Sequence, residues 1–179
     1  MKDLFICITP LEILIAEKII KYKKLPKKNC KVIYFVDKIN KRNNHYLKRI
    51  KKISSNSDFF VLNKYRYPFY FFKINNLVKN HNIKNIYLAA IDSSLIQFVL
   101  SKNKYQHIYT FDDGIGNLTK KYNMDFQLPF IKKFLYWLVG NRYNKESILS
   151  KSADHFTIYK NKKNNISKNP VYVGQLFDN

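Results

Sequence analysis

Leu4-Phe-Ile-Cys-Ile-Thr-Pro-Leu-Glu-Ile-Leu-Ile-Ala-Glu-Lys-Ile-Ile-Lys-Tyr-Lys23 joins a short apolar run to an amphipathic segment through a Thr-Pro pair. The first five residues are apolar and rich in isoleucine, which favours a β-strand. Next, Thr9 can cap a helix, Pro10 suits the first helical position, and Glu12 stands three residues after the cap, as in a capping box. The stretch therefore predicts a strand that turns at once into a helix over residues 11–23.

The same alternation of apolar runs and amphipathic segments continues along the chain. Strands are predicted at residues 4–8, 32–36, 59–62, 85–89, 107–111 and 156–159, and helices at residues 11–23, 44–53, 69–80, 94–100 and 128–139. Strands that alternate with helices of this length are typical of βαβ units and a parallel sheet. The expected fold class is α/β, a Rossmann-like parallel sheet with helices on both faces.

Length and composition favour one folded domain in a reducing compartment. The 179 residues are 46% hydrophobic and 16% aromatic, which is too apolar for a disordered chain and enough for a real core. Cys7 and Cys30 fall in or next to predicted strands, so we expect core residues and not a disulfide framework. The opening apolar run is too short for an export signal, and no run approaches the roughly 20 apolar residues of a membrane span. A cytoplasmic protein is expected.

The charge of the chain leaves two interpretations open. Lysine and arginine number 33 against 12 acidic residues, a formal net charge of +21. Nucleic-acid binding is disfavoured because only four of these cations are arginine, the residue whose planar fork suits phosphate and base recognition. We expect mainly a solvated basic surface, with an anionic lipid surface or an acidic glycolipid as the functional alternative.

The carboxyl ends of the predicted strands define a candidate functional edge, because ligands of doubly wound sheets gather there. Thr9, Asp37, Asp92 and the segment after Phe111 all follow predicted strands. For Thr9, a role confined to capping the helix is the alternative.

The densest chemical signal is Thr110-Phe-Asp-Asp-Gly-Ile-Gly-Asn117, directly after a predicted strand. Adjacent carboxylates raise each other's pKa and resist burial, so Asp112 and Asp113 indicate a use for their charge. A carboxylate in this place can act as a general base.

The rest of this segment suits close approach to a ligand. Gly114 and Gly116 permit positive φ angles, and Asn117 can hydrogen-bond a sugar hydroxyl. The alternative is a plain Asp-Gly turn that caps the next segment. The glycines do not form a dinucleotide fingerprint, since a third glycine is missing.

Metal and histidine chemistry fit the sequence less well. The Cys and His residues lack the spacing of metal ligands, so no metal site is predicted. The four histidines are scattered, and each is expected at a helix surface or a strand edge and not in catalysis; they are His45, His81, His107 and His155.

Residues 110–118 resemble the Phe-Asp-Asp-Gly-x-Gly-Asn-Leu segment of glycosyltransferase family 52, which includes lipooligosaccharide α-2,3-sialyltransferases. Residues 8–20, 84–90 and 152–159 are similar to further stretches of the family in the same order. Glu12 departs from the pattern, because glutamine is expected there. The likeness covers essentially the whole chain.

This resemblance implies a GT-B enzyme, in which two Rossmann-like domains face each other across a cleft. Residues 1–179 would form the amino-terminal, acceptor-side domain, with no counterpart of the donor-binding carboxyl-terminal domain, so the chain alone is expected to be inactive. The implied reaction is inverting transfer of sialic acid from the co-substrate CMP-sialic acid to a galactose of lipooligosaccharide, without a metal or other cofactor. The predicted site has Asp112 and Asp113 as catalytic candidates and the following as substrate-binding residues: Thr9, Pro10, Gly114, Gly116 and Asn117.

Two other functions stay open at this stage. One is a family 52 glycosyltransferase with another nucleotide-sugar donor, and the other is a non-catalytic basic module that binds membrane or nucleic acid. The expected partners are the lipooligosaccharide acceptor and a nucleotide sugar, with no nucleic acid. Peripheral contact with the inner membrane and a homodimer are further expectations.

Overall fold

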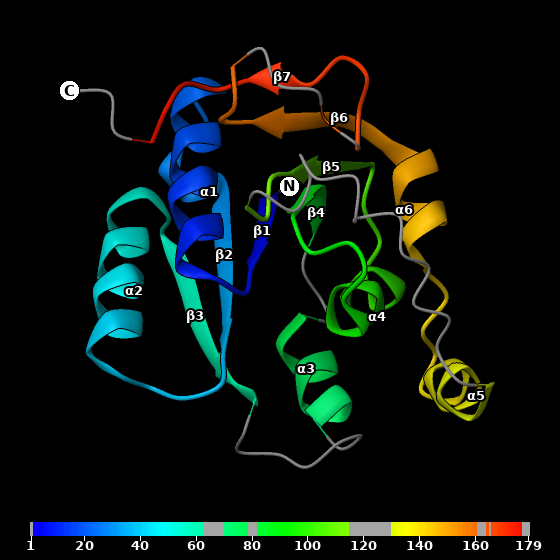
Figure 1. Ribbon diagram of the computed structural model, residues 1–179. Helices are drawn as coiled ribbons and strands as arrows, with labels where there is room; N and C mark the ends of the chain where they lie inside the picture. The colour runs from blue at the N-terminus through cyan, green and yellow to red at the C-terminus, as the bar shows by residue number, and fades with distance from the viewer. Residues whose placement is uncertain are drawn as a thin grey trace.

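Seven parallel strands form one sheet in the computed structural model, which describes residues 2–62, 70–78, 82–114, 130–160, 164 and 166–176 (Figure 1). The strands are β1 (Lys2–Cys7), β2 (Cys30–Val36), β3 (Asn56–Val61), β4 (Ile83–Leu88), β5 (His107–Phe111), β6 (Ser152–Thr157) and β7 (Val171–Tyr172). The helices are α1 (Pro10–Tyr22), α2 (Lys41–Ile53), α3 (Tyr70–Val78), α4 (Ser94–Lys102), α5 (Phe130–Leu138) and α6 (Lys145–Lys151), with a 3-10 turn at Lys27–Asn29. None of these described helices combines the length and apolarity needed to cross a bilayer.

The strand order is β3-β2-β1-β4-β5-β6-β7, so the chain winds outward from β1 in both directions. It first passes through β2 to β3, then returns to the other side of β1 with β4. In the central register Phe5 lies between Val32 and Tyr87. Because every pairing is parallel, all seven carboxyl ends lie at one edge, with the topological switch point between β1 and β4. The predicted α/β, Rossmann-like fold is confirmed.

Helices cover both faces of the sheet, as the alternation of side chains along the strands requires (Figure 1). In β1, Leu4 and Ile6 belong to a core cluster with α3, α4 and α6. Phe5 and Cys7 belong to a second cluster with α1 and α2. Cys7 and Cys30 are free and buried, which confirms their expected place in the core.

The turn from β1 into α1 follows the sequence prediction, with one difference. Thr9 is the N-cap, its hydroxyl accepts a hydrogen bond from the Glu12 backbone N–H at 3.3 Å, and Pro10 begins the helix. A capping box would return the Glu12 carboxylate to the Thr9 backbone N–H. Here the carboxylate reaches one residue further and accepts from the backbone N–H of Ile8 at 2.7 Å.

Two elements near the carboxyl end of the chain differ from the prediction. The helix α6 was not predicted, because seven residues are too few to show helical periodicity, although Asn144 and Ser147 form a capping box at its start. The strand expected at residues 156–159 instead spans Ser152–Thr157. This shift places His155 inside the sheet.

Candidate functional site

The Glu12 carboxylate closes the turn at the carboxyl end of β1. Its Oε2 accepts from the Ile8 backbone N–H at 2.7 Å, and its Oε1 accepts from the Thr9 hydroxyl at 3.1 Å. Only 1% of the residue is exposed. Burial raises the pKa of Glu12 to about 7 against the effect of these hydrogen bonds, and the charge of Asp113 adds to the rise. At neutral pH this carboxyl group is therefore close to half protonated.

The Asp112 carboxylate, directly after β5, lies inside a set of hydrogen-bond donors. The Thr157 hydroxyl and the Ile158 backbone N–H donate to its Oδ2 at 2.7 and 2.9 Å. At Oδ1, Nε2 of His155 lies at 3.1 Å and the side-chain amide of Asn164 at 3.4 Å. The residue is fully buried. These contacts tie the end of β5 to β6 and to the chain that follows β6.

His155 continues this network inside the sheet. Its Nδ1 lies 3.0 Å from the Thr110 hydroxyl, which is 3.1 Å from the Ser152 hydroxyl. With its proton on Nε2, the ring donates to Asp112 and accepts from Thr110, and the Asn164 amide then donates to Asp112 and not to Nε2. The expectation that His155 sits at a helix surface or a strand edge is wrong: it is 2% exposed, within a strand that is paired on both sides.

A sequence signal for this network exists in hindsight. Thr110 and Asp112 alternate across the end of β5, and His155 and Thr157 alternate in β6, so each pair points to one face of the sheet. The register pairs Thr110 with His155. Polar residues at alternate positions of two buried, neighbouring strands therefore indicate that these side chains hydrogen-bond one another. This indication can be used only when the strand boundaries are known.

Asp113 and Gly114 bring the chain after β5 to the first turn of α1. Asp113 is half-buried, and its charge acts on Glu12 and on Tyr159. Burial first, and then the charges of Asp112 and Asp113, raise the pKa of the Tyr159 phenol. Gly114 has a φ of +134°, and a Cβ there would lie 3.7 Å from Cδ2 of Leu11. The positive φ, more than the available space, is what requires glycine.

The structure thus brings together one part of the predicted site and separates another. Thr9, Glu12, Asp113 and Gly114 meet at the switch point, where Pro10 supplies the first turn of α1. Asp37 and Asp92 follow β2 and β4 at the same edge but are exposed.

Two predicted residues, Gly116 and Asn117, lie outside the described residues. Within the described ranges, no group of three or more His, Cys, Asp or Glu side chains could hold a metal ion.

Chemically, the edge presents one half-buried carboxylate beside a carboxyl group that is partly protonated. An ionised Asp113 can accept a proton or a hydrogen bond from a ligand hydroxyl, while a neutral Glu12 adds little negative charge. A phosphate would meet repulsion here from the Asp113 carboxylate. The arrangement suits a polyhydroxylated, uncharged group better than a phosphate.

Comparison with known proteins gives consistent results. The family model of glycosyltransferase family 52 matches residues 27–178. The chain is 29% identical over 99% of its length to an N-acetyllactosaminide alpha-2,3-sialyltransferase of Haemophilus influenzae, covering 59% of that protein. It is 31% identical over 93% of its length to a CMP-N-acetylneuraminate:beta-galactoside alpha-2,3-sialyltransferase of Pasteurella multocida, covering 54% of it. The chain therefore spans about half the length of the curated relatives it matches.

Proposed function

The chain belongs to glycosyltransferase family 52, and we propose that it serves the transfer of sialic acid from CMP-sialic acid to a galactose of a lipooligosaccharide acceptor. The observation that carries the proposal is the family match over residues 27–178, together with relatives whose names specify α-2,3-sialyl transfer. The nucleotide sugar is then a co-substrate, and the acceptor is a glycan.

Within this reaction, residues 1–179 are proposed to be the acceptor-side domain of a GT-B pair. The acidic character of the switch point supports this assignment, because the Asp113 carboxylate beside Glu12 favours sugar hydroxyls over the phosphate of CMP. The nucleotide would be held by a second domain. The relatives are long enough to contain one, because this chain covers only 59% and 54% of their length.

The two aspartates are proposed to have different roles. Asp113 is the general-base candidate, because it is half-buried and stands beside Glu12 at the carboxyl edge of the sheet. Asp112 is proposed as a positioning residue, because four donors surround its carboxylate. Thr9, Pro10 and Gly114 border the same edge and remain substrate-contact candidates.

The experiment joins residues 1–179 to the remainder of the Pasteurella multocida relative and assays the fusion with N-acetyllactosamine. Formation of a sialylated product from CMP-sialic acid, and none from UDP-glucose or UDP-galactose, is the expected result. Product from a UDP-sugar alone would replace the proposal with transfer of a different sugar within the same family. Binding of N-acetyllactosamine to the 179-residue chain, followed by NMR, tests the acceptor assignment separately.

A further inference from the structure

Helix α2 and the residues on either side of it form a strongly basic segment. Residues 38–57 contain seven lysine and arginine residues and no aspartate or glutamate. Six of these cations belong to the 13 residues of α2 itself. Five of the six form the surface that we call the α2 basic face, and all five are exposed: Lys41, Arg42, Lys48, Lys51 and Lys52.

Packing of the other side of α2 fixes the orientation of the helix. The buried side chain of Asn43 accepts a hydrogen bond from the Tyr34 hydroxyl of β2 at 3.1 Å. Ile50 is buried in the core cluster that α2 shares with α1. Nε of Arg49, the sixth cation, donates to the Glu17 carboxylate of α1. These contacts anchor α2 to β2 and α1 along its length.

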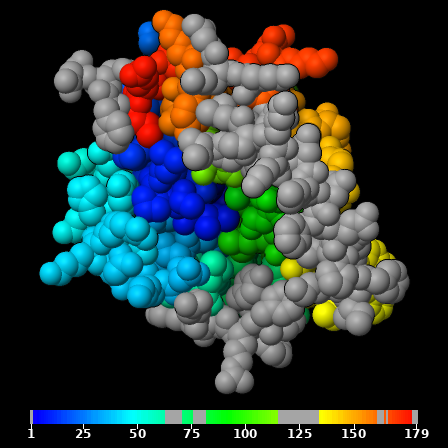
Figure 2. All heavy atoms as spheres, in the orientation of Figure 1, coloured from blue at the N-terminus to red at the C-terminus, as the bar shows by residue number. Residues whose placement is uncertain are grey.

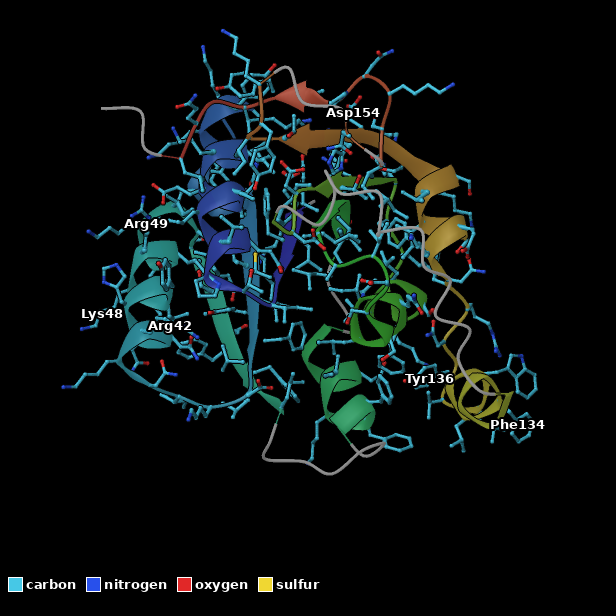
Figure 3. The ribbon with its side chains drawn as sticks, in the orientation of Figure 1. Arg42, Lys48, Arg49, Phe134, Tyr136 and Asp154 are labelled. Atoms are coloured by element: carbon cyan, nitrogen blue, oxygen red, sulfur yellow. The ribbon has the colours of Figure 1, made fainter. Side chains whose placement is uncertain are left out.

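The remaining cations follow the outer side of the helix. Lys41, Lys48 and Lys52 stand seven and four positions apart, a spacing that puts them on one side of α2 over about 16 Å of its axis. Figure 3 shows Lys48 on the side of α2 away from α1 and Arg42 on the side toward α1. In Figure 2 the light-blue and cyan atoms of α2 occupy one side of the molecule, beside the dark-blue atoms of α1. The α2 basic face is therefore turned to solvent.

This arrangement of charge opposes the stability of α2. Like charges three or four positions apart on a helix repel each other, as Lys48 does with Lys51 and Lys52. Lys41 and Arg42 stand in the first turn, where the helix dipole favours negative charge. Bound anions would relieve both effects, so the face suits an anionic ligand.

The α2 basic face begins next to the candidate site. Because α2 follows β2 after a short loop, it starts at the carboxyl edge of the sheet, as α1 does after β1. Burial raises the pKa of the Tyr34 phenol to about 12, while the charge of Arg42 lowers it and that of Glu12 raises it. Tyr34 thus lies within electrostatic reach of both the acidic switch point and the first turn of α2. A ligand that extends from the switch point over α2 passes from a negative to a positive surface.

We propose that the α2 basic face binds the phosphate and carboxylate groups on the inner sugars of the acceptor oligosaccharide, while the terminal galactose lies beside Asp113. This inference rests on the proposed function, because it takes lipooligosaccharide as the acceptor. The Asp113 carboxylate repels anionic groups and the cations of α2 attract them, so an acceptor with a neutral end and an anionic inner part is held in one direction. Lysine suits such a ligand, because its ammonium group is a point charge that binds phosphate without a fixed geometry.

Other anionic partners fit this face less well. Within α2, all of whose residues the structure describes, no large hydrophobic side chain is exposed. The bases of a nucleic acid would therefore find no exposed phenylalanine, tyrosine or tryptophan ring to stack on. The acyl region of a membrane would receive no apolar side chain from the face. Charged sugars need neither of these contacts.

The test uses the 179-residue chain and an acceptor without lipid. A lipooligosaccharide that ends in galactose is fully deacylated, and half of the resulting phosphorylated oligosaccharide is then dephosphorylated. Calorimetric titration at low salt should show that the phosphorylated form binds at least about tenfold more tightly. This difference should shrink several-fold at about 0.15 M salt, because exposed charges are then screened.

Paired variants separate a local site from the overall charge of +21. Lys48→Gln combined with Lys52→Gln removes two charges from the face and should weaken binding of the phosphorylated oligosaccharide by about tenfold. Lys104→Gln combined with Lys168→Gln removes two charges from exposed loop positions and should change the affinity by less than about twofold. The thermal midpoint of each double variant checks that it is folded.

The fused enzyme gives a second readout. Lys48→Gln combined with Lys52→Gln should raise KM for the phosphorylated oligosaccharide and leave KM and kcat for neutral N-acetyllactosamine unchanged. A fusion that is inactive, or that uses a UDP-sugar, bears on the proposed function and not on the binding measured by calorimetry. The two proposals therefore fail separately.

Three results would overturn the inference. The first is equal affinity for the phosphorylated and dephosphorylated oligosaccharides. The second is an equal loss of affinity in the two double variants, which would leave only the overall charge as the cause. The third is tighter binding of single-stranded DNA or of phosphatidylglycerol vesicles than of the phosphorylated oligosaccharide, lost in the Lys48→Gln and Lys52→Gln variant. That result would assign the α2 basic face to nucleic acid or to membrane.

Discussion

Nε2 of His155 in β6 lies 3.1 Å from Oδ1 of Asp112 at the end of β5, and both residues are buried. Adjacent aspartates therefore have unlike surroundings. Asp112 points into the protein and holds two strands together, while Asp113 remains half-buried at the edge beside Glu12. The like-charge repulsion expected from the sequence is reduced because donors surround one member of the pair.

The first prediction separates the two aspartates in the fused enzyme. Asp113→Asn should lower kcat by roughly 10²- to 10⁴-fold with little loss of stability, because it removes a base but keeps the size of the side chain. Asp112→Asn should mainly lower the free energy of unfolding, by about 1–3 kcal/mol, because an amide N–H would face donors such as Thr157 and Ile158. The measurements are kcat and the thermal midpoint. If Asp113→Asn keeps near-parental turnover, Asp113 is not the general base and only shapes the acceptor side of the site.

The second prediction concerns coupling between Asp112 and His155. In a double-mutant cycle with Asp112→Asn and His155→Gln, the two losses of stability should not add, and the coupling energy should be about 0.5–3 kcal/mol. Chemical denaturation of the 179-residue chain gives the four values. His107→Gln is the matched control, because His107 is exposed at the start of β5 and should show additivity with Asp112→Asn. Additive losses at His155 would argue against a shared network.

The third prediction concerns Lys23 at the end of α1. Its Nζ lies 4.4 Å from the centroid of the Tyr109 ring and 5.4 Å from that of Phe156. Lys23→Met keeps the apolar stem but removes the charge, so the free energy of unfolding should fall by about 0.5–2 kcal/mol. Lys48→Met on the surface of α2 is the control and should change stability much less. Equal losses of stability in both variants would show that the contact between the Lys23 ammonium group and the rings does not stabilise the fold.

The fold could be predicted from the sequence because local signals agree with the final structure. Apolar runs marked the strands, and Thr9-Pro10 marked the first helix to within one residue. The different surroundings of Asp112 and Asp113 could not be predicted, because the hydrogen-bond partners of Asp112 lie more than 40 positions away in the sequence. Their meeting depends on the β5–β6 register, and a four-residue error in the start of β6 was enough to hide His155.

The exposure of large apolar side chains on α5, Phe134 and Trp137 among them, could not be predicted for a related reason. Helical periodicity predicts that apolar residues share one side of the helix, but it does not say which side faces the core. That choice is made by Tyr136 against Phe71 and by the bonds from Asn141 to α4. Both contacts join segments that are far apart in the sequence.

The last prediction concerns Glu12 and pH. Its carboxyl pKa is raised from 4.5 to about 7, first by burial and further by the charge of Asp113. The folded chain therefore binds this proton more tightly than the unfolded chain does. Stability from this group is complete below about pH 4.5, falls as the pH rises toward 7 and is constant above that. The total loss is on the order of 3 kcal/mol for a shift of this size.

Glu12→Gln should remove this slope, because glutamine can still accept from the Ile8 N–H and can donate to the Thr9 hydroxyl. The variant should match the parent near pH 4.5 and exceed it in thermal midpoint above pH 7, since only the parent then has to bury a charge. Glu146→Gln, at an exposed residue of α6, should leave the pH profile unchanged. If the parent and Glu12→Gln instead keep parallel profiles across this range, the Glu12 carboxyl group is not the source of the pH dependence. The switch point would then be fully ionised at neutral pH and would hold two charged carboxylates, Glu12 and Asp113.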